Sequence, residues 1–363
     1  MNKSSGTLRA ISGLGSKGPA CFLMEAAGRR LLLDLGEGPP PGTVPDVGAI
    51  GRVDAVILSH GHRDHVGALP LLPNLGDPPV YATAPVAHGL AERIAVRPLA
   101  IGGTTDVLGM AVTTGRNGHA PGGVWLHFAT GDGFLYSGDY CRESTLYAFD
   151  APRFRAATAL IDCSYADYEQ PLADCRAALA AEAARGPLLL PVPANGRGPE
   201  IALELMRRGV NDIHVDDAMR AALQRLGDDD TVSLRDDARG DLARLAGLVR
   251  PIEGPRGVML AASADGMSGA TARLIPQFEP AAEVTILFTG YINPTTPAER
   301  LTKGGRAKTM RWNVHPRLSD TVALVHALAA KTVIPAFCDR AKLAALAAAL
   351  EPAQVTMDET VAI

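Results

Sequence analysis

The sequence predicts an α/β protein with two lobes. Its 363 residues exceed one ordinary small domain and suit two lobes, or one large α/β unit that carries an insertion. Short apolar runs occupy the first part of the chain, strand and helix patterns alternate in the middle, and a helix–strand–helix pattern follows at the end. These patterns indicate sheet layers first and a parallel α/β unit second.

The first part of the chain has the pattern of short strands. From Leu8 to about Asp139, apolar runs end at Gly, Pro or Asp, as in "ACFLMEA", "RRLLLDLG", "VDAVILSH", "VWLHFATG" and "GFLYSGDY". Short runs with turn residues between them are typical of strands in a sandwich or layered sheet.

The middle part alternates helices and strands. "LADCRAALAAEAARG" (172–186) and "GPEIALELMRRG" predict helices that stop at glycines, while "PLLLPVP", "GVMLAAS" and "VTILFTG" predict strands. The acidic stretch "GDDDTVSLRDDARGD" (227–241) predicts an exposed loop. The end of the chain, with "LSDTVALVHALAA", "TVIPAFC" and "RAKLAALAAALE", predicts a helix, a strand and a helix.

Composition excludes several classes of protein. Hydrophobic residues make up 47% and charged residues 20%, as in globular proteins, and no apolar run is long enough to predict a membrane span or a secretory signal. Five scattered cysteines outside any CxxC pair predict reduced thiols and a cytoplasmic protein. The net charge of −4 draws no nucleic acid by itself, and residues 165–305 are the acidic part, with 15 basic and 20 acidic residues.

The stretch "VILSHGHRDHVGALP" (56–70) concentrates metal-ligand residue types. His60 and His62 follow a predicted strand, and residues i and i+2 on an extended segment point the same way. Asp64 and His65 come just after them, where a turn can direct them at a second ion. Imidazole and carboxylate ligands without cysteine favour Zn²⁺ or Mn²⁺. The alternative is a solvated histidine-rich loop, or two histidines paired with Asp64, but four potential ligands in six positions favour the metal.

Two further residues suit the same site. His119 lies in the polar, glycine-flanked loop "RNGHAPGG", where packing gives no reason for a histidine. Asp139 closes an apolar run in "LYSGDY", where a carboxylate can bridge two ions.

These segments resemble the metallo-β-lactamase superfamily. The resemblance rests on "SHGHRDH", the later "GH" and "SGD", and it implies an αββα sandwich. It also implies that His60, His62 and His119 hold a first metal, that Asp64 and His65 hold a second, and that Asp139 bridges them. A hydroxide held by the ions would be the nucleophile.

The second half resembles the β-CASP nucleases, which include ribonuclease J, the pre-mRNA 3′-end cleavage subunit and Artemis-type enzymes. The segments that carry this resemblance are "LIDCSYAD", "LLLPVPANGRGPEIALEL", "AASADGMSGATARLI", "TILFTGYINPTTPAERL" and "WNVHPRLSD". The resemblance implies an α/β β-CASP domain at 165–305, inserted into a metallo-β-lactamase domain formed by 1–164 and 306–363.

The resemblance also implies roles in phosphodiester cleavage. Asp162 would orient His315, and His315 would protonate the departing oxygen, which suits a histidine held by a carboxylate. Arg197, just ahead of a helix, would hold a phosphate oxygen, as would Ser268 and Gly269. For Arg197 a surface ion pair is the alternative.

Two positions depart from the family pattern. RNA-processing members carry a last metal-binding histidine where "VIPAFCDR" places Phe337, and DNA-processing members carry an apolar residue there. Phe337 therefore favours the DNA-processing members, and its other interpretation is a weak or vacant second metal site. In addition, about three more residues separate His315 from Asp320 than the family's His-x-Asp spacing has.

The sequence therefore predicts a nuclease that uses two divalent ions, with zinc first and manganese as the alternative, on short RNA or single-stranded DNA. The acidic middle and the 5% of aromatic residues argue against a long single-strand groove. A hydrolase of a small phosphodiester or other small ester, and a weakly active scaffold subunit of a nucleic-acid processing complex, are the alternatives. A homodimer is expected from the resemblance, and no membrane partner is expected.

Overall fold

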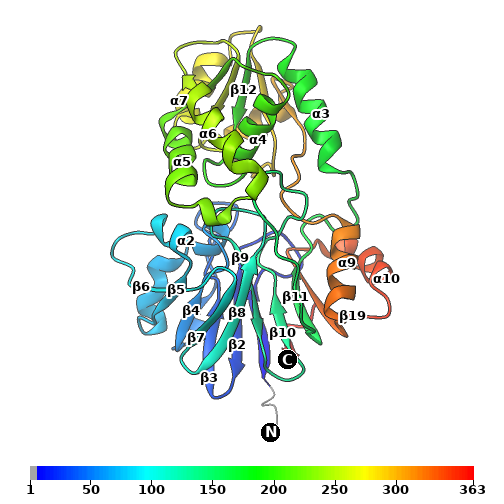
Figure 1. Ribbon diagram of the computed structural model, residues 1–363. Coiled ribbons are helices and arrows are strands. Elements are labelled where there is room, and N and C mark those ends of the chain that lie inside the picture. The colour runs from blue at the N-terminus through cyan, green and yellow to red at the C-terminus, as the bar shows by residue number, and fades with distance from the viewer. Residues whose placement is uncertain (1–5) are drawn as a thin grey trace. The chain divides into compact units, whose positions relative to one another are not determined.

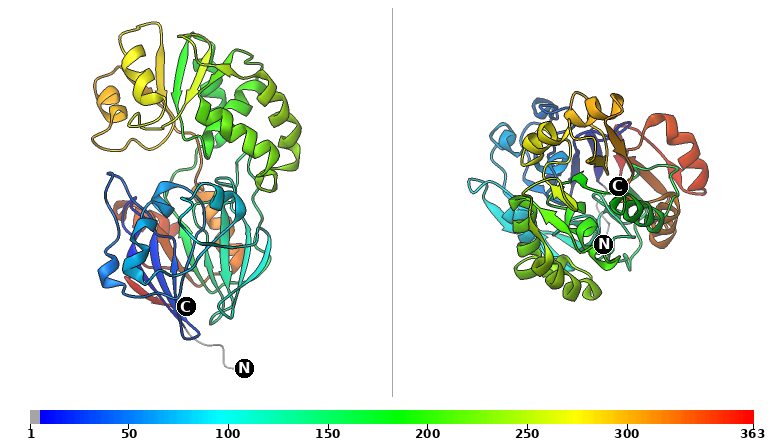
Figure 2. Two further views of the ribbon diagram at one scale, coloured as in Figure 1. Left: turned by 90° about the vertical axis from the view of Figure 1, so that its left-hand side faces the viewer. Right: turned by 90° about the horizontal axis from the view of Figure 1, so that it is seen from above.

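The computed structural model describes residues 6–363, and the chain folds into two compact units. The first unit comprises residues up to 142 together with 149–169 and 315–363, and the second comprises 143–148 and 170–314. The first unit is therefore discontinuous in sequence, and its C-terminal segments return to its N-terminal strands (Figure 2). The domain assignment of 1–164, 165–305 and 306–363 stays a prediction.

Two seven-stranded sheets form the first unit (Figure 1). In spatial order, the first sheet contains β20 (Thr360–Ala362), β1 (Thr7–Ser12), β2 (Cys21–Ala26), β3 (Arg29–Leu33), β4 (Ala55–Ile57), β5 (Val80–Ala82) and β6 (Val96–Pro98). The second sheet contains β19 (Gln354–Val355), β18 (Thr332–Ala336), β11 (Thr158–Asp162), β10 (Phe134–Tyr136), β9 (Val124–Phe128), β8 (Met110–Arg116) and β7 (Gly103–Val107).

The two sheets pack face to face. Alternation along β4 sends Ile57 into the core between the sheets, where it joins Tyr136 and Leu160 of the second sheet, and sends Val56 to the opposite face. Each fully buried Leu, Ile or Phe in such a core contributes about 2 kcal/mol. Consecutive residues of a strand point to opposite faces of the sheet. A short run of consecutive apolar residues is therefore buried on both faces.

Helices cover both outer faces of this sandwich. On the first sheet lie α1 (Arg63–Val66), α2 (Ala84–His88) and the 3-10 turns Val47–Ala49 and Leu69–Leu75; on the second lie α9 (Leu318–Leu328), α10 (Leu343–Ala349) and the turn Arg340–Lys342. Leu324 and Leu328 of α9 pack on Leu135 and Ile161. The predicted αββα sandwich is confirmed.

The second unit is built on an all-parallel six-stranded sheet. Its order is β14 (Arg250–Pro251), β13 (Ile213–Val215), β15 (Val258–Ala261), β12 (Leu188–Pro191), β16 (Thr285–Phe288) and β17 (Ala307–Thr309). Its helices are α3 (Leu172–Ala183), α4 (Arg197–Arg207), α5 (Asp217–Asp228), α6 (Arg239–Leu248), α7 (Thr271–Phe278) and α8 (Pro297–Lys303). Separate apolar clusters fill the two faces of the sheet, so the predicted α/β insertion is confirmed in class.

The acidic stretch 227–241 is mostly exposed, as its composition predicts, but it is not a loop. It contains the end of α5, two 3-10 turns (Thr231–Ser233 and Asp236–Ala238) and the start of α6, and Leu234 and Ala238 are buried in the core of the second unit. Backbone hydrogen bonds join it to 146–148, including one from Ala148 N to Ser233 O. Burial of these two apolar side chains fixes the stretch against the second unit although most of its residues are charged or polar.

Candidate metal centre

Four elements of the first unit direct ligand side chains to one place. His60 follows β4, and His62 precedes α1 while His65 lies within it. His119 lies in the loop after β8, and Asp139 in the loop after β10. The ends of β4 and β10 lie near one another, since a Cβ on Gly138 would lie only 2.7 Å from the Cβ of Ser59, and Val124 N at the start of β9 donates to Ser59 O.

The potential ligand atoms form three overlapping groups, within each of which all atoms lie within 4.8 Å of one another. His62 Nδ1 lies 2.9 Å from His119 Nε2, and His65 Nε2 lies 3.2 Å from Asp139 Oδ1. The groups are His60, His62 and His119; His60, His65 and Asp139; and His119, Asp139 and His315. The sequence-predicted ligands His60, His62, His65, His119 and Asp139 are thus brought together.

Two buried polar atoms of this cluster make no hydrogen bond. They are Nε2 of His60 and Oδ1 of Asp139. The hydroxyl of Ser59 donates to Asp34 at 2.7 Å, so it accepts from Nδ1 of His60 at 3.1 Å and leaves the lone pair of His60 on Nε2. A buried lone pair without a partner is costly, and a cation would satisfy both atoms. The donor set, imidazole nitrogens with a carboxylate, fits a divalent ion of the zinc type.

The charges around the cluster also suit a cation. Burial lowers the pKa of His60 well below its usual range, which keeps it in the neutral, ligating form. Burial alone would raise the pKa of Asp139, but the imidazoles of His65 and His315 hold it well below its usual range, so it is a carboxylate. Burial lowers the pKa of His65, yet the charges of Asp139 and Asp34 outweigh it and raise that pKa well above its usual range.

Asp34 is a site residue that the sequence did not single out. It follows β3, is fully buried, and accepts hydrogen bonds from Ser59 N (2.7 Å), Ser59 Oγ (2.7 Å), Tyr136 OH (2.6 Å) and His65 Nδ1 (2.7 Å). It therefore fixes the orientation of His65 directly and of His60 through Ser59, as carboxylates behind metal ligands do. The only signal in the sequence is a charged residue inside the apolar run "RRLLLDLG".

The predicted pair of Asp162 and His315 is present. Asp162 is fully buried at the end of β11, and its Oδ2 lies 2.7 Å from His315 Nδ1. Its other oxygen, Oδ1, accepts hydrogen bonds from Ser164 N and Oγ, and its backbone N donates to Ser137 Oγ. His315 Nδ1 lies 3.7 Å from Asp139 Oδ2, so the pair borders the ligand cluster.

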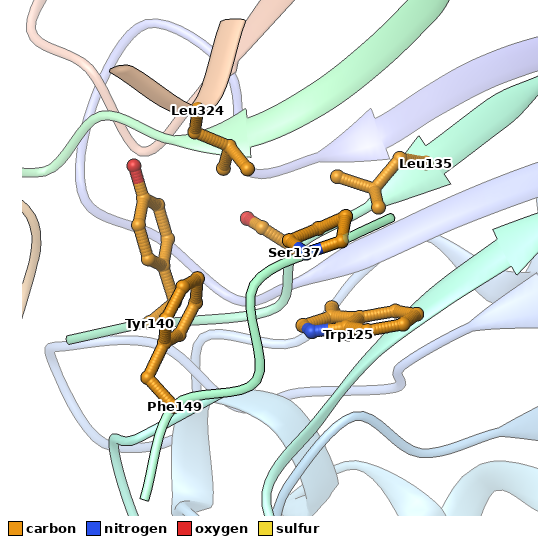
Figure 3. A pocket seen from close by; sticks show the side chains of 7 residues that line it. Trp125, Leu135, Ser137, Tyr140, Phe149 and Leu324 are labelled. Carbon is orange, nitrogen blue, oxygen red and sulfur yellow. The ribbon is translucent and has the colours of Figure 1, made fainter. Parts of the chain in front are cut away.

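A narrow apolar crevice, too small to hold a water molecule, lies behind the segment that carries Asp139 (Figure 3). Ser137 and Tyr140, on either side of Asp139, line it with five mostly apolar neighbours: Trp125, Leu135, Phe149, Pro152 and Leu324. No charged side chain lines it, so it offers no recognition of a phosphate.

Asp64 and Phe337 lie beside the cluster without completing it. Among residues 6–363, no group of three close ligand atoms includes Asp64; its Oδ2 lies 3.9 Å from Lys17 Nζ. Phe337 is buried, and its ring centroid lies 5.5 Å from that of His65.

The predicted phosphate-binding residues belong to the second unit. Arg197 begins α4, and its Nε donates to Thr289 Oγ1 at 3.1 Å, which links the ends of β12 and β16. Ser268 and Gly269 lie in the loop between β15 and α7, where Gly269 has a φ of +61° and a Cβ would lie only 2.6 Å from Ala262 O. All three therefore follow the carboxyl ends of parallel strands, where α/β sheets bind ligands.

Comparison with known proteins agrees with this geometry. Residues 15–184 match the model of the metallo-beta-lactamase superfamily. The transcription termination factor FttA of Cenarchaeum symbiosum is 30% identical over 250 residues, which are 55% of this chain and 39% of that protein. A ribonuclease of Thermus thermophilus is 31% identical over 163 residues, 37% of this chain and 36% of its own.

Two further similarities extend the comparison. Cleavage and polyadenylation specificity factor subunit 2 of Oryza sativa is 42% identical over 81 residues, 21% of this chain and 11% of its own. The chain thus spans well under half the length of these relatives. A crystallised protein of unknown function from Enterococcus faecalis V583 superposes over 99% of both chains with a TM-score of 0.63 at 13% identity, which shows a shared fold alone. Residues 15–184 are thus similar to the metallo-beta-lactamase superfamily, and the chain is similar to proteins named as a transcription termination factor, a ribonuclease and a cleavage and polyadenylation factor.

Proposed function

We propose that this chain is a metal-dependent phosphodiesterase, a nuclease that cleaves short RNA or single-stranded DNA. The observation that carries the proposal is the Asp162–His315 pair beside the ligand cluster, with His315 Nδ1 2.7 Å from Asp162 and 3.7 Å from Asp139. A metal cluster alone serves many hydrolases, whereas a carboxylate-held histidine next to it adds the acid that a departing alkoxide needs.

His60, His62 and His119 would hold the first of two predicted divalent ions, Asp64 and His65 the second, and Asp139 would serve both; zinc or manganese suits these donors. When bound, such ions supply Lewis acidity and lower the pKa of a water molecule. The rest of the chemistry belongs to the chain. Asp162 Oδ2 accepts a hydrogen bond from His315 Nδ1–H, so the protonated imidazole of His315 can give its Nε2 proton to the leaving oxygen. Asp34 and Ser59 keep His60 and His65 in the ligating orientation.

Arg197, Ser268 and Gly269 would bind phosphate oxygens of the substrate. Arg197 offers a guanidinium fork at a helix start, and the Ser268–Gly269 loop offers backbone N–H groups ahead of α7. The acidic balance of residues 165–305 favours a short substrate over a long strand. The same observation favours the second candidate, hydrolysis of a small phosphodiester.

The setting of the reaction is part of the proposal. Each of the five cysteines, all within the described residues, is a buried thiol, which supports a reducing compartment such as the cytoplasm. Within residues 6–363 no helix is both long and apolar enough to cross a bilayer. The expected homodimer stays a prediction, which light scattering of the purified chain would test.

Cleavage of end-labelled single-stranded RNA and of matched DNA, with Zn²⁺ or Mn²⁺, tests the nuclease. His315→Ala should lower the rate about 10²- to 10⁴-fold while the metal content stays unchanged. His326→Gln, on the exposed face of α9, is the matched control and should keep the wild-type rate. If neither polymer is cleaved by metal-loaded protein but a small phosphodiester is, the second candidate replaces the first.

A further inference from the structure

The loop between β1 and β2 is fastened to the segment that follows β18. Phe337 N donates to Gly13 O at 2.7 Å, Leu14 pairs with Ala336, and Arg340 N donates to Gly15 O at 3.4 Å. Gly13 has a φ of +94°, and a Cβ there would lie 2.7 Å from the ring of Phe22 and 3.2 Å from that of Phe337. The loop is therefore held at the edge of the ligand cluster, and Lys17 lies two residues beyond its last anchor.

Lys17 supplies a positive charge to Asp64. Its Nζ lies 3.9 Å from Asp64 Oδ2, and the two side chains are 29% and 23% exposed. The backbone holds the two segments together as well, because Ala20 N donates to Asp64 O at 2.8 Å. Asp64 is the one sequence-predicted ligand that joins none of the ligand groups in the described part of the chain.

Phe337 fills the neighbouring position with an apolar ring. It is buried, lies edge-on to His65 with the centroids 5.5 Å apart, and also contacts Phe22 at 6.2 Å. A phenyl ring provides no ligand atom. His65 is already oriented by Asp34 through Nδ1, so only its Nε2 faces Asp139.

The three ligand groups share members, which limits how many ions they hold at once. An imidazole nitrogen binds one ion, and Nδ1 of His60 is engaged by Ser59, so the two groups that contain His60 compete for its Nε2. His60, His62 and His119 make one three-ligand group, and three protein ligands with one open position are what a catalytic zinc-type ion requires. A second ion would draw on Asp64, His65 and position 337, of which Asp64 faces Lys17 and Phe337 is apolar.

We propose that this chain binds one divalent ion tightly, at His60, His62 and His119, and that the Lys17 ammonium takes the place of a second ion beside Asp64. The inference refines the proposed function, on which its relevance to catalysis rests. An ammonium there offers one fixed positive charge and hydrogen-bond donors for a phosphate oxygen.

Ion counting tests the proposal without an activity assay. Purified wild type, Phe337→His, the double variant Lys17→Met/Phe337→His and the control Lys342→Met are dialysed against Zn²⁺ or Mn²⁺, and the metal per chain is measured. Lys342 pairs with Asp167 at 3.0 Å on the exposed surface and so matches Lys17 in chemistry. Histidine tolerates the left-handed backbone that Phe337 has, with φ +60°, so the variant should fold, which circular dichroism checks.

We expect about one tightly bound ion in the wild type and in Lys342→Met, and about two in the double variant. Phe337→His alone should bind the second ion at least about tenfold more weakly than the double variant, because Lys17 still occupies Asp64. Two tight ions in the wild type, or equal second-ion affinity in the single and double variants, would overturn the proposal. If the chain binds one ion but cleaves no nucleic acid, this inference holds and the proposed nuclease function is wrong. If the chain binds no ion, both proposals are wrong.

Discussion

Asp34 Oδ2 lies 2.7 Å from Nδ1 of His65, and both side chains are fully buried in the first unit. The same oxygen accepts from Ser59 Oγ and Tyr136 OH, while Oδ1 accepts from Ser59 N. One carboxylate therefore satisfies four donors, and it sets the tautomer of His60 through the Ser59 hydroxyl. The ligand cluster depends on a residue that is not in it.

Asp34→Asn should weaken both the fold and metal binding. An amide nitrogen in place of either oxygen faces donors instead of accepting from them, which costs about 3 kcal/mol in the free energy of unfolding. With its acceptor gone, the Ser59 hydroxyl can donate to His60 Nδ1 and shift the proton to Nε2, so metal affinity should fall about 10- to 100-fold. Calorimetric titration with Zn²⁺ and urea unfolding measure the two effects. Asp358→Asn, at an exposed position, should change neither.

Removing the metal should destabilise the first unit. His60 Nε2 and Asp139 Oδ1 are buried without hydrogen bonds, and an ion bound only by the folded state adds about 2.7 kcal/mol at a free concentration of 100 times Kd. Chelator-treated protein should therefore melt several degrees lower, and added Zn²⁺ should restore the transition. His119→Asn removes a member of two ligand groups and should abolish most of this zinc-dependent shift. An equal shift in that variant would mean that zinc stabilises the chain elsewhere.

Much of this site could be predicted from the sequence because several of its ligands lie close together in the chain, just after a strand. His60, His62 and His65 stand within one short segment after β4, and a strand end fixes their direction. Asp34 could not be identified that way, since its role arises from the parallel pairing of β3 with β4, which sets Leu33 opposite Ile57 and brings Asp34 to Ser59. The residues of a strand do not by themselves identify the strand with which it pairs.

For Asp64 and for the acidic stretch 227–241, the local sequence pattern also lacks the contacts with distant residues that the structure shows. The spacing of Asp64 from His60 fits a ligand, and the packing of the Gly13–Gly15 loop also places Lys17 Nζ 3.9 Å from Asp64 Oδ2, which the sequence does not predict. In 227–241 the charges suggest a loop, but Leu234 and Ala238 find a core to enter only once the second unit has assembled. In both cases a contact between residues distant in sequence decides the outcome.

Acid should weaken the first unit partly through Asp150. Burial raises the pKa of Asp150, but its hydrogen bonds with Arg116 outweigh this and hold the pKa below its usual range. A lowered folded pKa adds stability above the unfolded value of about 3.9, and this contribution disappears as the pH falls through the folded pKa. Because both side chains are about one-third exposed, we expect only about 1 kcal/mol at pH 7. Urea unfolding of the wild type and Asp150→Asn should show this gap at pH 7 and a smaller gap near pH 3; a constant gap would contradict the ionic origin.

Glu200 should be the corresponding support of the second unit. It is buried in α4 and accepts hydrogen bonds from Ser144 Oγ (2.8 Å), Thr145 N (2.6 Å) and Trp312 Nε1 (3.0 Å), which tie the segments 143–148 and 312–314 to the helix. Glu200→Ala leaves these buried donors without an acceptor, and we expect a loss of about 3 kcal/mol. Glu253→Ala, exposed in the same unit, should cost little.

The two tryptophans make the Glu200 experiment specific to the second unit. Trp312 contacts Glu200, whereas Trp125 lies in the first unit, so a Trp125→Phe background leaves fluorescence from the second unit alone. Burial raises the pKa of Glu200, which means that the folded unit holds its proton more tightly than the unfolded chain. The stability that Glu200 contributes should therefore be greatest at low pH and decline as the pH rises through the folded pKa. Unfolding midpoints of Trp312 fluorescence that stay equal in Glu200→Ala and Glu253→Ala at every pH would show that the carboxylate does not hold these segments.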